Sequence, residues 1–216
     1  MAVTGLSPYP FHEQTISLGS RKKGRGMGAF EHVIVLLSFV YALAIAHLLL
    51  TTARIIGAWE RVRFSWFHAY WMFNALIILV IDWVSYWDMR DLPNWSMVSI
   101  AVVMMQSFTD YMQAALVCPE IPAEGKIDLI AFHATRSRRY IGAFAITTVM
   151  ALITNTYFGG TYKIGDLIAQ NAAVLPLIAV SVTATIVRKR WVDIAAPILL
   201  LAIWTYYLVD LQAALK

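Results

Sequence analysis

The fold of this chain is decided first by residues 29–56, which read AFEHVIVLLSFVYALAIAHLLLTTARII. No Asp, Glu, Lys or Arg falls between Glu31 and Arg54. A helix needs about 20 apolar residues to cross about 30 Å of hydrocarbon, at a rise of about 1.5 Å per residue. This stretch therefore predicts a membrane-spanning helix.

Five later segments have the same apolar character. They cover about 65–87, 95–117, 139–158, 166–187 and 191–213. Backbone N–H and C=O groups in lipid must pair within their own segment, and none of these runs alternates as the strands of a β-barrel would. The sequence thus predicts an all-α polytopic membrane protein, a bundle of about six transmembrane helices over 27–216, preceded by a polar basic tail over 1–26. Pro176 and Pro197 lie inside spans and predict kinks.

The composition agrees with a membrane protein. Of 216 residues, 60% are hydrophobic and 14% are charged, whereas soluble domains carry roughly 25% charged residues. The net charge of +4 comes from short basic clusters between apolar segments, which argues against nucleic acid as a partner. Cys118 is the only cysteine, so an internal disulfide is excluded and no cysteine–histidine spacing predicts zinc.

Lys and Arg residues are distributed unevenly between the predicted loops. The loops after spans one, three and five carry ten of them, and the opposite side carries three. By the positive-inside rule, the richer loops are expected in the cytoplasm and both termini outside. The ten are Arg54, Arg61, Arg63, Lys126, Arg136, Arg138, Arg139, Arg188, Lys189 and Arg190, and the three are Arg90, Lys163 and Lys216.

The N-terminal tail conflicts with this orientation, because it would carry Arg21, Lys22, Lys23 and Arg25 to the outside. Two explanations remain open. In the first, the tail is cytoplasmic and one of the six predicted spans does not cross. In the second, the tail is not native and translation starts at Met27, directly before the first apolar run, which makes the charge pattern consistent.

The one long connection, 118–138, allows two interpretations. Its second half predicts either a short interfacial helix, with Ile127 and Ile130 toward lipid and arginines toward headgroups, or an ordinary polar loop. Aromatic residues near the span ends, among them Trp59, Trp71 and Tyr86, predict the belts that line membrane interfaces.

Polar residues inside the spans are the candidates for function, because burying them in lipid costs several kcal/mol unless they are paired or hydrated. Counting residues from the cytoplasmic end of each span places His47, Asn74 and Asp110 at one inner level. Asp82 and Asp210 fall at an outer level. Gln106 and Gln113 flank Asp110 on the same helix face. These levels predict a transport path with two polar stations.

Three classes of function are compatible with this pattern. Aspartate and histidine suit the passage or coupling of protons, cations or a small solute across the bilayer. Alternatively, the same residues only hold helices together in a non-transporting subunit or scaffold of a larger complex. The third class is an intramembrane redox protein, in which His47 and His68 would ligate haem, but the chain has no C-x-x-C-H sequence.

No motif points to a soluble enzyme or to a named family. We therefore expect no catalytic residues, no metal and no cofactor. The expected partners are the lipid bilayer and, for an assembly, further copies of the chain or another membrane subunit, with no nucleic acid. The expected location is a cell membrane, the inner membrane if the chain is bacterial.

Overall fold

A computed structural model describes residues 28–92, 94–160, 163–187 and 189–214, and the side chains of 190 and 208–214 lie outside that description. The described part is an all-α bundle, which confirms the predicted class. The predicted tail over 1–26 and the side chain of Asp210 are not among the described residues.

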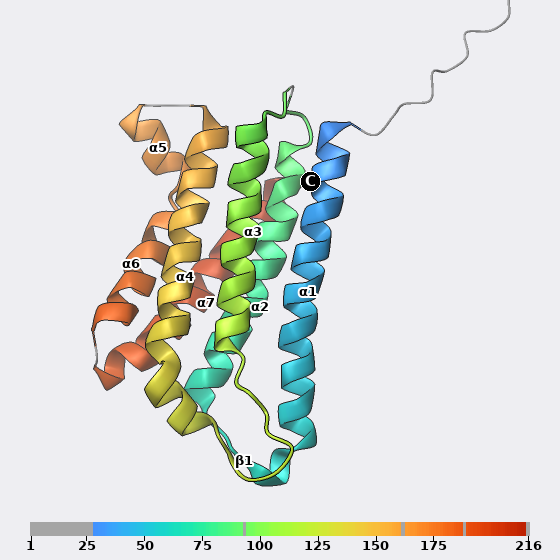
Figure 1. Ribbon diagram of the computed structural model, residues 1–216. Helices are drawn as coiled ribbons and strands as arrows, with labels where there is room; N and C mark the ends of the chain where they lie inside the picture. The colour runs from blue at the N-terminus through green and yellow to red at the C-terminus, as the bar shows by residue number, and fades with distance from the viewer. Residues whose placement is uncertain (1–27, 93, 161–162, 188, 215–216) are drawn as a thin grey trace, which may run out of the picture.

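Long helices stand side by side in the bundle and reverse direction from one to the next (Figure 1). Within it, α3 packs against α1, α2 and α4, while α7 packs against α2 and α6. Two short 3-10 helices, Trp59–Arg61 and Tyr86–Met89, extend the turns after α1 and α2. The α-helices are α1 (Ala29–Gly57), α2 (Trp66–Ser85), α3 (Met97–Val117), α4 (Leu129–Gly159), α5 (Ile164–Gln170), α6 (Val174–Ile186) and α7 (Arg190–Ala214).

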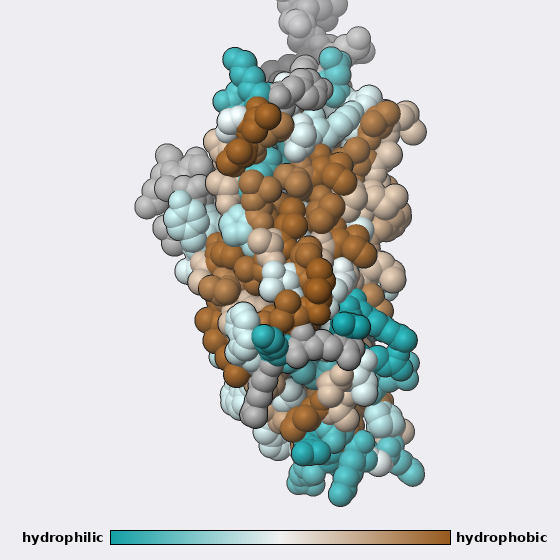
Figure 2. Space-filling view, turned by 90° about the vertical axis from the view of Figure 1, so that its left-hand side faces the viewer, coloured by the Kyte–Doolittle hydropathy of each residue, from teal (hydrophilic) through white to brown (hydrophobic). Residues whose placement is uncertain are grey.

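Three stretches in the described part are long and apolar enough to cross a membrane, namely α1, Trp66–Met89 and α4. The pair α5 and α6, bent by 74°, makes a fourth if it forms one span. A broad apolar surface covers the middle of the molecule between hydrophilic ends (Figure 2). The described part therefore contains helices apolar enough to span a membrane, as predicted, and of the six predicted spans three to four meet these criteria.

The loops after α1 and α3 meet at one end of the bundle. Strand β1 (Val62–Arg63) pairs in parallel with β2 (Ile127–Asp128). At this end α3 stops well short of α1 and α2, and an extended segment leads from it down to β2 (Figure 1). The end of α3 therefore lies deeper in the bundle than the ends of its neighbours.

Asp128 fixes the start of α4. Its carboxylate accepts a hydrogen bond of 2.8 Å from the backbone amide of Ala131 and pairs with Arg63 at 3.1 Å. The amide bond first, and the guanidinium second, hold the pKa of Asp128 below its usual value. From this cap α4 runs without a break to Gly159, so 128–138 is neither a separate interfacial helix nor a loop. Leu129, His133 and Tyr140 recur on its buried face, which explains why this polar segment stays helical.

The predicted span over 166–187 is broken, because α5 ends at Gln170 and α6 begins at Val174. Pro176 is the third residue of α6. Proline lacks an N–H and its ring clashes with the carbonyl group four residues earlier, which here belongs to Ala172 in the break. Pro197, by contrast, lies inside the continuous helix α7.

Two of the residues predicted to form interfacial belts belong to the core instead. Trp71 is 1% exposed and Tyr86 is 2% exposed. Trp71 shares the buried face of α2 with Ala75 and Ile78, at helical spacing. Position near a span end does not specify the face of the helix on which a residue lies. Here the face determines whether the aromatic ring is buried or exposed. Trp59 remains exposed, as a belt residue should.

Candidate functional site

Five polar side chains from three helical segments meet inside the bundle, and we call them the carboxyl cluster. Two carboxyl groups lie at its centre, those of Asp82 and Asp110. An amide and two phenol groups surround them. The members are Tyr41 from α1, Asp82 and Tyr86 from α2 and the turn after it, and Gln106 and Asp110 from α3. All are buried except Asp82, which is half-buried.

One amide group joins the two carboxyl groups. Gln106 Nε2 donates to Asp82 Oδ2 at 3.1 Å and to Asp110 Oδ1 at 3.1 Å. The hydroxyl of Tyr41 donates to the other oxygen of Asp110. The hydroxyl of Tyr86 lies 3.4 Å from that of Tyr41 and donates to the carbonyl of Val103 at 3.4 Å. Both oxygens of Asp110 thus have donors, from two different helices.

Helical spacing explains why these residues face each other. Gln106 and Asp110 are four residues apart and lie one above the other on α3. On α1, Tyr41 belongs to the buried face with Leu37 and Leu48. The polar residues of α3 therefore point into the bundle, while its apolar neighbours such as Phe108 are exposed on the outside.

The charge balance of the carboxyl cluster is unusual. In the described part of the chain, neither Asp82 nor Asp110 forms an ion pair with a Lys, Arg or His. The same Gln106 amide nitrogen contacts both carboxyl groups, so the two groups lie close together. Two adjacent negative charges without a cation repel strongly in a medium of low polarity, so a proton held between the two groups stabilises the site.

Asp82 also faces a second space. With Ser85 and Asn155 it lines a cavity of about 50 Å³ between α2, α4, α6 and α7. That volume is enough for water, which needs about 10–15 Å³ of such space and polar partners. Trp204 lines the same cavity, and its buried Nε1 donor has no partner among the described residues. Asp82 therefore connects the carboxyl cluster to a small, mostly apolar cavity that has room for water.

Residue counting from the span ends puts Asp82 and Asp110 at different levels, but in the structure a single amide reaches both. The cause is the position of α3. Because α3 ends deep in the bundle, a residue counted from its end lies farther from the interface than the count suggests (Figure 1). One member of each predicted station therefore belongs to one site.

The other predicted path residues lie apart from the carboxyl cluster. His47 is on the exposed face of α1. Asn74 is fully buried on α2, where its amide donates to the carbonyl of Tyr70 at 2.8 Å and its own oxygen has no partner among the described residues. The backbone of Asp210 is in α7, and its side chain is not described.

Tyr41 and Tyr86 are site residues that the sequence interpretation missed. A tyrosine in a span suits an interface as well as a core, because the ring is apolar and the hydroxyl is polar. The available signal was spacing: Tyr41 lies four residues after Leu37 and seven before Leu48, on the buried face of its helix.

The histidines considered for haem are in different surroundings. His47 is exposed, whereas His68 is fully buried and packs against the ring of Phe132 at 5.0 Å. Among the described residues, no group of three or more His, Cys, Asp or Glu side chains is arranged to hold a metal ion.

No protein-family model matches the chain, and comparisons with curated proteins and with solved structures also find no match. The carboxyl cluster and its surroundings are therefore the features that bear on function.

Proposed function

We propose that this protein passes or couples protons across a membrane, with the carboxyl cluster as its central station. The observation that carries the proposal is the buried pair Asp82 and Asp110, bridged by Gln106 and without a cation among the described residues. Ionisable groups inside membrane helices are costly and characteristic of proton relays. A site that stabilises one shared proton can accept and release it in turn.

Two neighbours support a route through the site. The Tyr41 hydroxyl touches Asp110 on one side. On the other side, Asp82 opens to the cavity lined by Ser85 and Asn155. A proton on the pair then has a hydroxyl group at one end and space for water at the other, and both can carry it in a hydrogen-bonded chain.

We further propose that α3, the bent pair α5–α6 and α7 also cross, which gives six spans. Support comes from α3, whose 21 residues extend about 30 Å at about 1.5 Å each. Its polar residues, such as Asp110, are buried, while Met105 and Met112 are exposed. The polar residues that lower the mean hydropathy of α3 therefore face the interior of the bundle and not the lipid. The location would be a cell membrane, the inner membrane if the chain is bacterial.

The span count has a direct test that uses the single native thiol. In a Cys118→Ser background, Asn94→Cys and Ala123→Cys place one thiol at each end of α3. Six spans predict that an impermeant maleimide labels the two positions from opposite sides of the membrane. Labelling of both from the same side would show that α3 does not cross.

A non-transporting scaffold is the second candidate, and one observation favours it. Asp110 has donors on both oxygens. In this alternative, the carboxyl cluster holds α1, α2 and α3 together and carries no protons. Hydrogen bonds between membrane helices contribute roughly 0.6 kcal/mol on average. A scaffold would keep its partners and lose only stability when Asp110 is replaced.

Reconstitution in proteoliposomes distinguishes the two candidates. With a pH-sensitive dye inside and an imposed potential, the wild type should carry protons, and Asp110→Asn and Asp82→Asn should abolish the flux with the fold intact. His47→Ala is the matched control, because His47 is polar, lies in a span and is exposed away from the carboxyl cluster. Flux that survives in both aspartate variants, or wild-type flux no higher than in empty liposomes, would reject the relay.

A further inference from the structure

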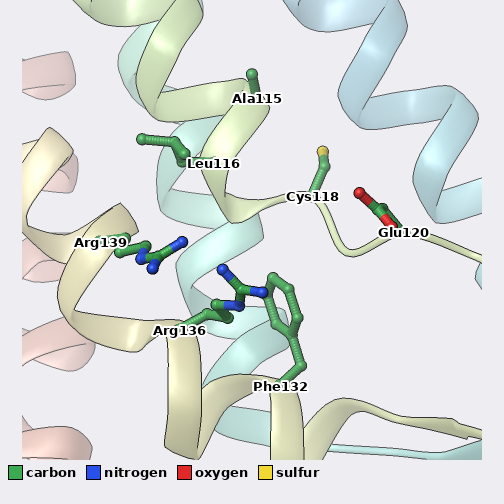
Figure 3. A pocket seen from close by; sticks show the side chains of 7 residues that line it. All are labelled: Ala115, Leu116, Cys118, Glu120, Phe132, Arg136 and Arg139. Carbon is green, nitrogen blue, oxygen red and sulfur yellow. The ribbon is translucent and has the colours of Figure 1, made fainter.

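A second polar site lies at the end of the bundle where β1 and β2 pair. A pocket of about 340 Å³ opens between the end of α3 and the early turns of α4 (Figure 3). Ala115 and Leu116 of α3 form one wall, and Arg136 and Arg139 of α4 form another. It shares no residue with the carboxyl cluster, so it is a separate site.

The two arginines are free to bind an anion. They are three residues apart on α4, which puts them on one face of the helix, and Figure 3 shows both guanidinium groups turned toward the pocket. Among the described residues, neither forms an ion pair or a hydrogen bond. Glu120 lies across the pocket, which leaves two positive charges against one negative.

Apolar surface continues from the pocket along α3. Leu116 lines the pocket, and Met112 and Phe108 follow it at intervals of one helical turn, all exposed. This order matches a lipid, whose charged headgroup lies at the interface and whose acyl chains run along apolar helix surface. Because α3 ends deep in the bundle, the recess at its end brings the arginines next to the apolar wall.

We propose that this pocket binds the phosphate headgroup of an anionic phospholipid, with Arg136 and Arg139 as its ligands and the acyl chains on α3. The planar guanidinium group donates parallel hydrogen bonds to phosphate oxygens, which suits two arginines on one phosphate. Each basic residue near an anionic membrane surface contributes about fivefold to binding.

The native thiol reports on this pocket without an added label. Cys118 lines it and is the only cysteine in the chain. A bound headgroup should cover the thiol and slow its alkylation by N-ethylmaleimide, which is uncharged and therefore not repelled by the lipid. The full chain would be placed in nanodiscs of phosphatidylcholine with or without phosphatidylglycerol, and lipid retention would be measured in parallel by native mass spectrometry.

Arg138 provides the control on the same turn of α4. It is two residues from Arg136, about 200° around the helix, and lines a different cavity with His133 and Asp193. The proposal predicts that phosphatidylglycerol protects Cys118 in the wild type and in Arg138→Gln. In the double variant Arg136→Gln, Arg139→Gln, about 25-fold less anionic lipid should be retained, and the protection should be lost.

Two results would overturn the proposal. Equal protection in the double variant would assign the effect to the general surface charge of the bilayer. Protection by millimolar inorganic phosphate in pure phosphatidylcholine discs would assign the site to free phosphate. The single variant Arg139→Gln, expected to show about a fivefold loss of retained lipid, keeps the test decisive if the double variant does not fold.

Discussion

Replacing Gln106 by Leu tests the geometry of the carboxyl cluster directly. The side chain of Gln106 is 3% exposed, and its amide donates both hydrogen bonds that join Asp82 to Asp110. Leucine has a similar volume, so the packing is largely kept. The substitution removes both donors and leaves two carboxyl groups facing each other.

The expected loss follows from the two bonds. The bond to Asp82 joins α2 to α3, and such interhelical bonds are worth roughly 0.6 to 1.7 kcal/mol in membranes. The bond to Asp110 joins residues four apart on one helix, which adds roughly 0.2–0.5 kcal/mol. Gln106→Leu should therefore lower the free energy of unfolding by about 1–2 kcal/mol.

Gln113→Leu is the matched control, because Gln113 lies on the same face of α3 and is 2% exposed. The oxygens of both amides lack a partner among the described residues, but only the Gln106 nitrogen donates to carboxyl groups. Removing the Gln113 amide should therefore cost nothing or stabilise the fold slightly. The measurement is reversible unfolding in mixed micelles with increasing SDS, followed by circular dichroism. Equal changes for the two variants would show that Gln106 does not bridge the carboxyl groups.

Three further predictions concern packing, backbone and pH. Leu79→Ala in the core of α2 should lower the free energy of unfolding by about 2–5 kcal/mol, measured by the same SDS titration; a loss below about 1 kcal/mol would contradict the buried position. Gly160→Ala should lower the free energy of unfolding by about 1 kcal/mol, because Gly160 caps the end of α4 at φ 63°. Gly57→Ala, where an added Cβ would meet open space, should not lower it. Equal thermal midpoints for the two variants would refute this prediction. The pKa of Asp128 is held below its usual 3.8, so its contribution to stability is complete above that value and is lost as the pH falls through the lower folded-state value. Asp128→Ala should remove this acid dependence from the unfolding curve, and an unchanged dependence would contradict the cap.

Some site residues could be found from the sequence because the argument needs only composition and helical spacing. Asp110 and Gln106 stand out as polar residues within an apolar segment, and their spacing of four puts them on one helix face. His47 has the same kind of sequence surroundings, but it is exposed on α1. Spacing relates residues within one helix, but it does not say which face meets a neighbour.

The sequence by itself determined the class of protein. Apolar runs as long as a bilayer is thick must form helices, because the backbone hydrogen bonds must be made within each segment. The start of α4 was not found from the sequence, which placed it near residue 139, because the Asp128 cap lies in a polar segment outside the apolar run. The sequence also predicted that the basic residues of the loops after spans one and three lie on the same side. Among them are Arg136 and Arg139, which lie at the β1–β2 end.

Only the tertiary structure decided how deep each helix sits and what its polar residues meet. The early end of α3 brings Asp110 to the level of Asp82 and opens the recess that holds Arg136 and Arg139. The physical reason is that helix depth follows from packing between neighbours and from the extended segment between α3 and β2. Both are long-range properties, whereas the apolar pattern that makes each helix is local.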